Sequence, residues 1–326
     1  MRQGAQRWFG VLTWALLCLA CEPAFAADEL VFAVSRSPLS LPIYVAEAEG
    51  YFKAEGAPVR IVDCPFGRIC LKQMLDGQAQ LATVADSPIV FASFTTDRLR
   101  ILATLGTTRS ENKIVTRKAS NIRAPADLAG RKVGTLVGTS AHYLLDSAAT
   151  LAGVDPSRVN VVPMQADKMA AALAGGEVDA LALFEPFAYN VMRSLGDQGV
   201  VLPTLRAYEQ TWNLVAAQSL VPARDRDLTA VIRALDRADA FIHREPAKAR
   251  AILRQRLGLD EAALDWMWDE KIYSLNLEQS LLNTLEGQAR WALRNGHVSG
   301  KAPNYLSLVH AAPLASVRPK AVTIKY

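Results

Sequence analysis

The sequence has few histidines and few cysteines, four of each among 326 residues. The histidines are scattered and show none of the close spacings typical of metal sites; they are His142, His243, His297 and His310. The chain has no Gly-Lys-Ser/Thr phosphate-binding loop, and Gly138-Thr139-Ser140-Ala141-His142 lacks the closing glycine of a nucleophile elbow. We therefore expect no metal, no cofactor and no catalytic residues.

Neither sign of charge is in large excess. The chain has 36 basic and 32 acidic residues, and removing Arg2, Arg7 and Glu22 with an N-terminal signal leaves 34 against 31. A nucleic-acid-binding domain usually carries a clustered basic excess, so we expect no nucleic-acid partner. Beyond the N-terminal segment, no apolar run approaches the ~20 residues that a membrane-spanning helix needs.

The N-terminal segment has the pattern of a secretory signal peptide. A positively charged head precedes the apolar run Val11–Ala20, and Ala24-Phe25-Ala26 forms a small-x-small cleavage site. We interpret residues 1–26 as a signal peptide and expect a secreted, soluble mature chain. The alternative is a lipoprotein anchored through Cys21, although Cys18 stands where a lipobox has leucine.

Two cysteines, Cys64 and Cys70, remain after this cleavage. An exported protein with one remaining pair usually oxidises it, so we predict a disulfide around a small loop. Free thiols are the alternative. A metal site is disfavoured because no histidine is close in the sequence.

Two stretches of the chain resemble each other at an offset of 99 residues. Gly77 precedes an apolar run and Asp86-Ser87-Pro88, and Gly176 precedes another apolar run and Glu185-Pro186. A repeat this long indicates two related α/β units rather than a short-period solenoid. Two such lobes form a cleft between them, and a cleft suggests a ligand.

Short apolar runs alternate with helical stretches from residue 30 to about residue 220, which predicts parallel sheets. After Val221 we expect amphipathic helices without intervening strands, packed back on the first lobe. The predicted division is a discontinuous first lobe, 27–115 and 212–326, and a second lobe, 116–211. Chain crossings near 112–118 and 208–216 would form the hinge.

Four loops are expected at the carboxyl ends of the strands, where open α/β sheets bind ligands. They are Ser35–Ser40, Ala85–Ser87, Gly138–His142 and Phe184–Pro186. Each leads into a helix, so free N–H groups and a positive dipole end suit an oxyanion. The hydroxyls are equally well explained as helix caps. Asp86 and Glu185 hold an amine or ring nitrogen of a ligand, bond across the hinge or, as we favour, cap the following helices.

The same stretches resemble a known family. Pro42–Ala46 and Gly50–Gly56 are similar to the opening of the nitrate/sulfonate/taurine substrate-binding proteins of ABC transporters, the family that includes the thiamine-pyrimidine synthases. Asp127–Gly134 with Gly138-Thr139 matches the second-lobe entry, and Leu173–Ala180 with Glu185-Pro186 matches a later signature. The resemblance covers about residues 30–220.

This resemblance implies a type II periplasmic-binding fold that closes on a small ligand and presents it to a membrane permease. Two departures from the family pattern leave the substrate open. The loop Cys64–Cys70 is not general to the family, and we expect it to bring Phe66 and Arg68 toward the pocket. Phe184 stands where many members have tryptophan. Trp212, at the second crossing, is a further candidate for ligand contact. The candidate ligand residues are Ser35, Arg36, Ser37, Phe66, Asp86, Ser87, Gly138, Thr139, Ser140, Glu185 and Trp212.

We therefore expect a periplasmic, monomeric solute-binding protein that captures a sulfonate, nitrate or related oxyanion for an ABC permease. An enzyme of the thiamine-pyrimidine synthase type is the first alternative. It is disfavoured because its cofactors are cytosolic. A sensor module that reports the ligand to a membrane receptor is the second, and the sequence does not separate it from transport.

Overall fold

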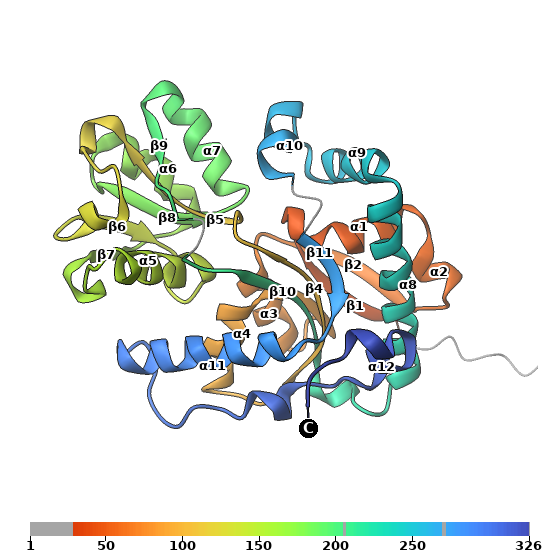
Figure 1. Cartoon of the computed structure of the whole chain (residues 1–326). Helices are drawn as coiled ribbons and strands as arrows, with labels where there is room; N and C mark the ends of the chain where they lie inside the picture. Colours follow the sequence, from red (N-terminus) through yellow and green to blue (C-terminus); the bar gives the residue numbers. More distant parts are fainter. Residues whose placement is uncertain (1–28, 205–206, 269–271, 326) are drawn as a thin grey trace, which may run out of the picture.

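The computed structural model describes residues 29–204, 207–268 and 272–325 (Figure 1). The predicted signal peptide and Cys21 lie outside the described residues. None of the described helices is long and apolar enough to cross a membrane.

The first lobe is built on a six-stranded sheet with the order β11-β4-β10-β3-β1-β2. Strands β1, β2 and β3 run parallel, while β10 inserts antiparallel between β3 and β4. The buried apolar runs of the sequence form the central strands, as expected when helices cover both faces of a sheet. The strands are β1 Leu30–Ser35, β2 Val59–Cys64, β3 Leu81–Ala85, β4 Leu99–Thr108, β10 Gln210–Ala217 and β11 Tyr273–Asn276.

The second lobe repeats this arrangement in a five-stranded sheet with the order β7-β6-β8-β5-β9. Strand β8 occupies the place of β3, and each is followed directly by one of the two acids of the 99-residue repeat, Glu185 after β8 and Asp86 after β3. The repeat therefore reflects two lobes of the same topology. Asp86 already belongs to the next helix, so the loop expected there is absent. The strands are β5 Asn112–Arg117, β6 Lys132–Thr135, β7 Asn160–Pro163, β8 Ala180–Phe184 and β9 Gly199–Val201.

Each lobe has its own apolar core, and helices cover both sheets. Gly50, Gly153 and Gly176, which lie at or just past the C-terminal ends of three helices, have positive φ. The helices are α1 Leu41–Ala48, α2 Tyr51–Ala54, α3 Gly67–Leu75, α4 Asp86–Ser93, α5 Ser140–Leu151, α6 Ala166–Gly175, α7 Phe187–Leu195, α8 Asp225–Arg244, α9 Pro246–Leu257, α10 Glu261–Met267, α11 Gln279–Arg294 and α12 Ala312–Val317.

The chain crosses between the sheets after β4 and again before β10. The first crossing comprises residues 109–111, because all of β5 pairs with β8 and β9 in the second sheet, slightly earlier than the predicted 112–118. The second crossing ends where β10 begins at Gln210. Asn112 and Gln210, one at each crossing, are joined by a side-chain hydrogen bond of 2.8 Å.

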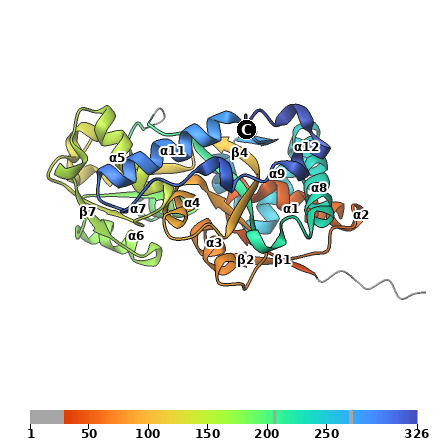
Figure 2. The same cartoon turned by 90° about the horizontal axis from the view of Figure 1, so that it is seen from below.

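The C-terminal tail packs mainly on the core of the first lobe, as predicted. The expectation that it contains no strand was wrong: β11 pairs antiparallel with β4 at the sheet edge. Tyr273-Ser274-Leu275-Asn276 alternates apolar and polar side chains, which is typical of a half-buried strand, and this short signal was overlooked. That the strand pairs with an existing edge depends on tertiary contacts. Seen from below, α11 runs beside α4 and α5, so the tail also reaches the second lobe (Figure 2).

The predicted disulfide is confirmed: Cys64 and Cys70 are bonded, with their Cα atoms 5.6 Å apart. The bond joins the end of β2 to the first turns of α3. It therefore closes the loop that carries Phe66 and Arg68.

Candidate functional site

A pocket lies between the two lobes at the carboxyl ends of the parallel strands. The free space inside it is small, with a cavity volume of only about 20 Å³. A ligand larger than a few atoms must therefore part the lobes or shift the lining side chains. The lining residues are Ser35, Ser37, Pro65, Phe66, Gly67, Arg68, Ala85, Pro88, Glu111, Thr139, Ser140, Phe184, Glu185, Gln210 and Trp212.

Hydroxyl-bearing residues from both lobes line this pocket. The hydroxyls of Ser37, Thr139 and Ser140 donate to protein acceptors, which are Glu111 Oε1, Leu136 O and Asn112 Oδ1. Ser35 ends β1, and its carbonyl oxygen accepts from Ser37 N–H in the tight turn that follows. Thr139 and Ser140 stand at the start of α5, whose first N–H groups lack intrahelical partners. Gly138 precedes them with φ of 79°, a left-handed conformation that favours glycine, and it does not line the pocket.

The disulfide-closed loop forms the apolar wall. The Phe66 ring packs across the lobe boundary on Phe184 and Phe187, with centroids 5.8 and 6.5 Å away. Arg68 Nη1 donates to Val137 O of the second lobe at 3.0 Å. Burial lowers the pKa of Arg68 from its high usual value, and the guanidinium stays charged at neutral pH. These contacts hold the lobes together on this side.

Two carboxyl groups, Glu111 and Glu185, line the pocket. Burial, reinforced by the charge of Glu185, raises the pKa of Glu111 to about 8, although Lys113 and the Ser37 hydroxyl act in the opposite direction. Glu111 is therefore protonated at neutral pH and can donate a hydrogen bond.

Glu185 is fully engaged by the protein. Its Oε2 accepts from Tyr189 N at 3.0 Å and so caps α7. Its Oε1 accepts from Trp266 Nε1 of the tail at 2.6 Å and lies 2.7 Å from Lys113 Nζ. Capping was the favoured prediction for this residue, and the structure shows it. The tail contact was not anticipated.

Asp86 does not line the pocket. It is fully buried, and burial is the largest cause of its raised pKa. Its carboxylate accepts from Ser87 N at 2.7 Å, from Thr211 N at 2.9 Å and from the Tyr208 hydroxyl. Asp86 thus ties the start of α4 to the second crossing. Neighbouring Ser87 is also buried and outside the pocket.

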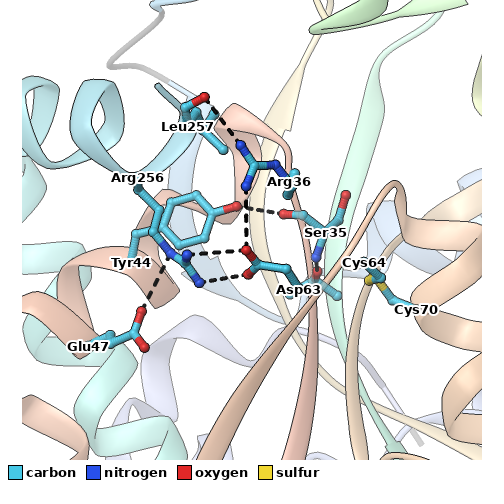
Figure 3. Close-up of polar contacts among 10 residues, drawn as sticks. Ser35, Arg36, Tyr44, Glu47, Asp63, Cys64, Cys70, Arg256 and Leu257 are labelled. Atoms are coloured by element: carbon cyan, nitrogen blue, oxygen red, sulfur yellow. Dashed lines mark hydrogen bonds and ion pairs between the residues drawn. A yellow bond between two sulfur atoms is a disulfide. The ribbon is translucent and has the colours of Figure 1, made fainter. Parts of the chain in front are cut away.

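Arg36 does not line the pocket, and its side chain lies between Asp63 and Leu257 (Figure 3). Its guanidinium lies 3.6 Å from Asp63 and donates to Leu257 O at 3.3 Å. Asp63 in turn pairs with Arg256 of the tail. Ser35 and Ser37 line the pocket, whereas Arg36, at the centre of the tight turn between them, contacts the tail.

Sequence reasoning missed some pocket residues. Neither Glu111 nor Gln210 was among the candidate ligand residues, because neither lies in a motif typical of a binding site. Their position at the two chain crossings could have indicated that they line the pocket, because both crossings border the cleft. Arg68 was expected to shape the pocket, and the structure places it there.

Two lobes of type II topology with a pocket between them define the periplasmic-binding class of fold. The chain belongs to the NMT1/THI5-like family, whose model matches residues 37–249. It is 25% identical over 182 residues to the taurine-binding periplasmic protein of Escherichia coli, covering 56% of each chain. It is 26% identical over 199 residues to a putative aliphatic sulfonates-binding protein of the same organism, covering 61% of this chain and 62% of that one.

These matches each span less than two thirds of the relative's length. The fold match is more extensive. The alkanesulfonate-binding protein SsuA from Xanthomonas axonopodis pv. citri, solved bound to MOPS, has a TM-score of 0.75 and 20% identity. The alignment covers 87% of this chain and 99% of that one. This structural match shows that the two chains share a fold.

Proposed function

We propose that this protein is a periplasmic solute-binding protein that captures a small sulfonate or related oxyanion and delivers it to an ABC permease. The observation that carries the proposal is the interlobe pocket, which hydroxyl-bearing residues of both lobes line at strand ends and at the start of α5. A sulfonate is also what the matched relatives' names indicate for those proteins.

The charges around the pocket are compatible with an anion. Lys113 balances Glu185, and Glu111 is neutral below about pH 8 because its pKa is raised. Arg68 then contributes the remaining positive charge, and the N-terminal end of α5 adds a favourable dipole. A desolvated oxyanion with several donors around it is held more strongly than in water.

The proposal extends to the partners and the place of action. We propose a monomer that works in the periplasm after signal cleavage, and no chemical step in the pocket. Closure around the ligand would provide the shape that the permease recognises, since a ligand stabilises the state that it binds better.

A thermal-shift screen tests the proposal with taurine, ethanesulfonate, nitrate, bicarbonate and a pyrimidine. A ligand present at a hundred times its Kd adds about 2.7 kcal/mol of stability. Arg68→Met should weaken binding about ten-fold or more, because a charged hydrogen bond contributes roughly 1.5–3 kcal/mol. Arg36→Met is the matched control and should bind normally. Turnover of one of these compounds without a stability shift would overturn the proposal.

The affinity of the protein for a plain alkanesulfonate and its affinity for taurine should change with pH in opposite directions. From about pH 6 to about pH 8, Glu111 begins to ionise. A plain alkanesulfonate should bind more weakly as a negative charge develops beside it. Taurine should bind more tightly if its ammonium group faces Glu111. Isothermal titration calorimetry at both pH values, repeated with Glu111→Gln, measures whether the affinity for each sulfonate falls or rises with pH.

A further inference from the structure

Three potential metal ligands that are distant in the sequence meet behind the pocket. His142 and Asp146 lie one turn apart on α5 of the second lobe, so their side chains share a face. His297 comes from the tail, just beyond the C-terminal end of α11. One ligand atom from each of the three lies within 4.8 Å of the other two, and the His142 and His297 rings are 4.5 Å apart.

The surroundings of this cluster also point to a ligand. His297 Nε2 is buried and has no hydrogen-bond partner, and it lies 3.6 Å from Asp146 Oδ2. Leaving such an atom unpaired is costly, so it needs an explanation. Trp291 Nε1 donates to Asp146 Oδ2 at 2.9 Å, which orients the carboxylate as outer-shell groups do in metal sites.

We propose that His142, Asp146 and His297 bind a transition-metal ion of the Zn²⁺ class. Two imidazoles and one carboxylate are a common ligand set for zinc, and a water would supply the fourth position. His142 Nδ1 has only a long contact of 3.5 Å with Gly138 N, which a metal ion can replace. This site is independent of the proposed ligand class.

The metal ion would link the second lobe to the tail that packs on the first lobe. Its ligands on α5 begin two residues after Ser140, which lines the pocket. An ion held from both sides therefore holds the start of α5 in place and stabilises the closed arrangement. The competing explanation is an ion pair between Asp146 and a protonated His297, with no metal.

Metal analysis of the purified protein, prepared without a polyhistidine tag and treated with a chelator, tests the site. Titration with Zn²⁺ should show one equivalent bound, and Co²⁺ should give the visible absorption of a tetrahedral complex. Zn²⁺ should also raise the unfolding temperature. Failure of the wild-type protein to bind either ion would overturn the proposal in favour of the ion pair.

Variants assign the ligands. Trp291→Phe changes an outer-shell group and should weaken Zn²⁺ binding by roughly 10–100-fold. His297→Gln removes a ligand at a partly exposed position and should weaken Zn²⁺ binding by more than that. His243→Ala is the matched control, because His243 Nε2 lies 3.7 Å from an aspartate, Asp239, much as His297 Nε2 lies 3.6 Å from Asp146. It should bind Zn²⁺ normally.

Circular dichroism and the unfolding temperature of each metal-free variant check the fold. Unchanged Zn²⁺ affinity in a folded His297→Gln would contradict the assignment, as would loss of binding in His243→Ala alone. If Trp291→Phe fails to fold, His297→Gln and the wild-type titration still decide.

Discussion

Ser37 Oγ donates a hydrogen bond of 3.1 Å to Glu111 Oε1, and both residues line the pocket between the lobes. Ser37 belongs to the first lobe and Glu111 to the first crossing. The contact places a buried carboxyl group at the first crossing between the two lobes. Four predictions follow from this and from three other contacts.

The buried carboxyl of Glu111 should make stability depend on pH. Its folded-state pKa is about 8, well above the ordinary value of 4.5. The folded state therefore holds a proton that the unfolded state releases above about pH 4.5. The resulting stabilisation is complete below about pH 4.5 and disappears as pH rises through about 8, with a size on the order of a few kcal/mol.

Urea unfolding at about pH 5, 7 and 9 measures this effect. Glu111→Gln removes the titrating group and keeps its size, so the variant should lose less stability than the wild type as pH rises. Parallel pH profiles for the two proteins would contradict the prediction.

Asp86→Ala should destabilise the protein strongly. The change removes the acceptor for Thr211 N and the Tyr208 hydroxyl, leaving buried donors unpaired at the second crossing. We expect a loss of about 2–4 kcal/mol in the free energy of unfolding, measured in urea. Asp76→Ala is the control: Asp76 pairs with Lys72 at the surface, and its removal should cost no more than about 0.5 kcal/mol. Equal losses for the two variants would refute the role given to Asp86.

Trp266→Phe should favour opening of the lobes. The variant keeps a ring but loses the Nε1–H that Glu185 Oε1 accepts at 2.6 Å, a contact between the tail and the second lobe. A hydrogen bond to a charged group contributes roughly 1.5–3 kcal/mol, so ligand should dissociate about ten-fold faster.

Small-angle X-ray scattering without ligand gives an independent measurement, because a more open ensemble has a larger radius of gyration. Trp268→Phe is the control, since the Trp268 ring packs on Tyr273 within the first lobe, with centroids 6.2 Å apart. A scattering profile of Trp266→Phe identical to that of the wild type would argue against a closing role for the tail.

Removing the disulfide should destabilise the loop that carries Phe66 and Arg68. For a loop this short, the chain-entropy model gives about 2 kcal/mol of stabilisation, which the double variant Cys64→Ser, Cys70→Ser should lose. Thermal unfolding with and without a reductant measures it. The reductant should lower the unfolding temperature of the wild type and leave the double variant unchanged. A wild-type protein insensitive to reductant while its thiols become titratable would disprove this.

Much of the fold was predictable because the relevant signals are local. The alternation of apolar runs and helices, and the offset between Asp86 and Glu185, placed both acids after corresponding strands. Ser35, Ser37, Thr139 and Ser140 were predicted from strand and helix ends and Trp212 from its place at the second crossing, and all five line the pocket. Ligand contact by these residues stays a proposal.

The sequence by itself determined the two α/β lobes, the loops that border the cleft and the cysteine pair, because each depends on short-range periodicity or spacing. Only the tertiary structure decided that Arg36 faces the tail and that Glu111 faces the pocket. It alone brought His297 to His142 and Asp146, and joined Trp266 to Glu185. These contacts join segments that are far apart in the chain. They depend on how the lobes and the tail pack against one another, and no local sequence pattern encodes that packing.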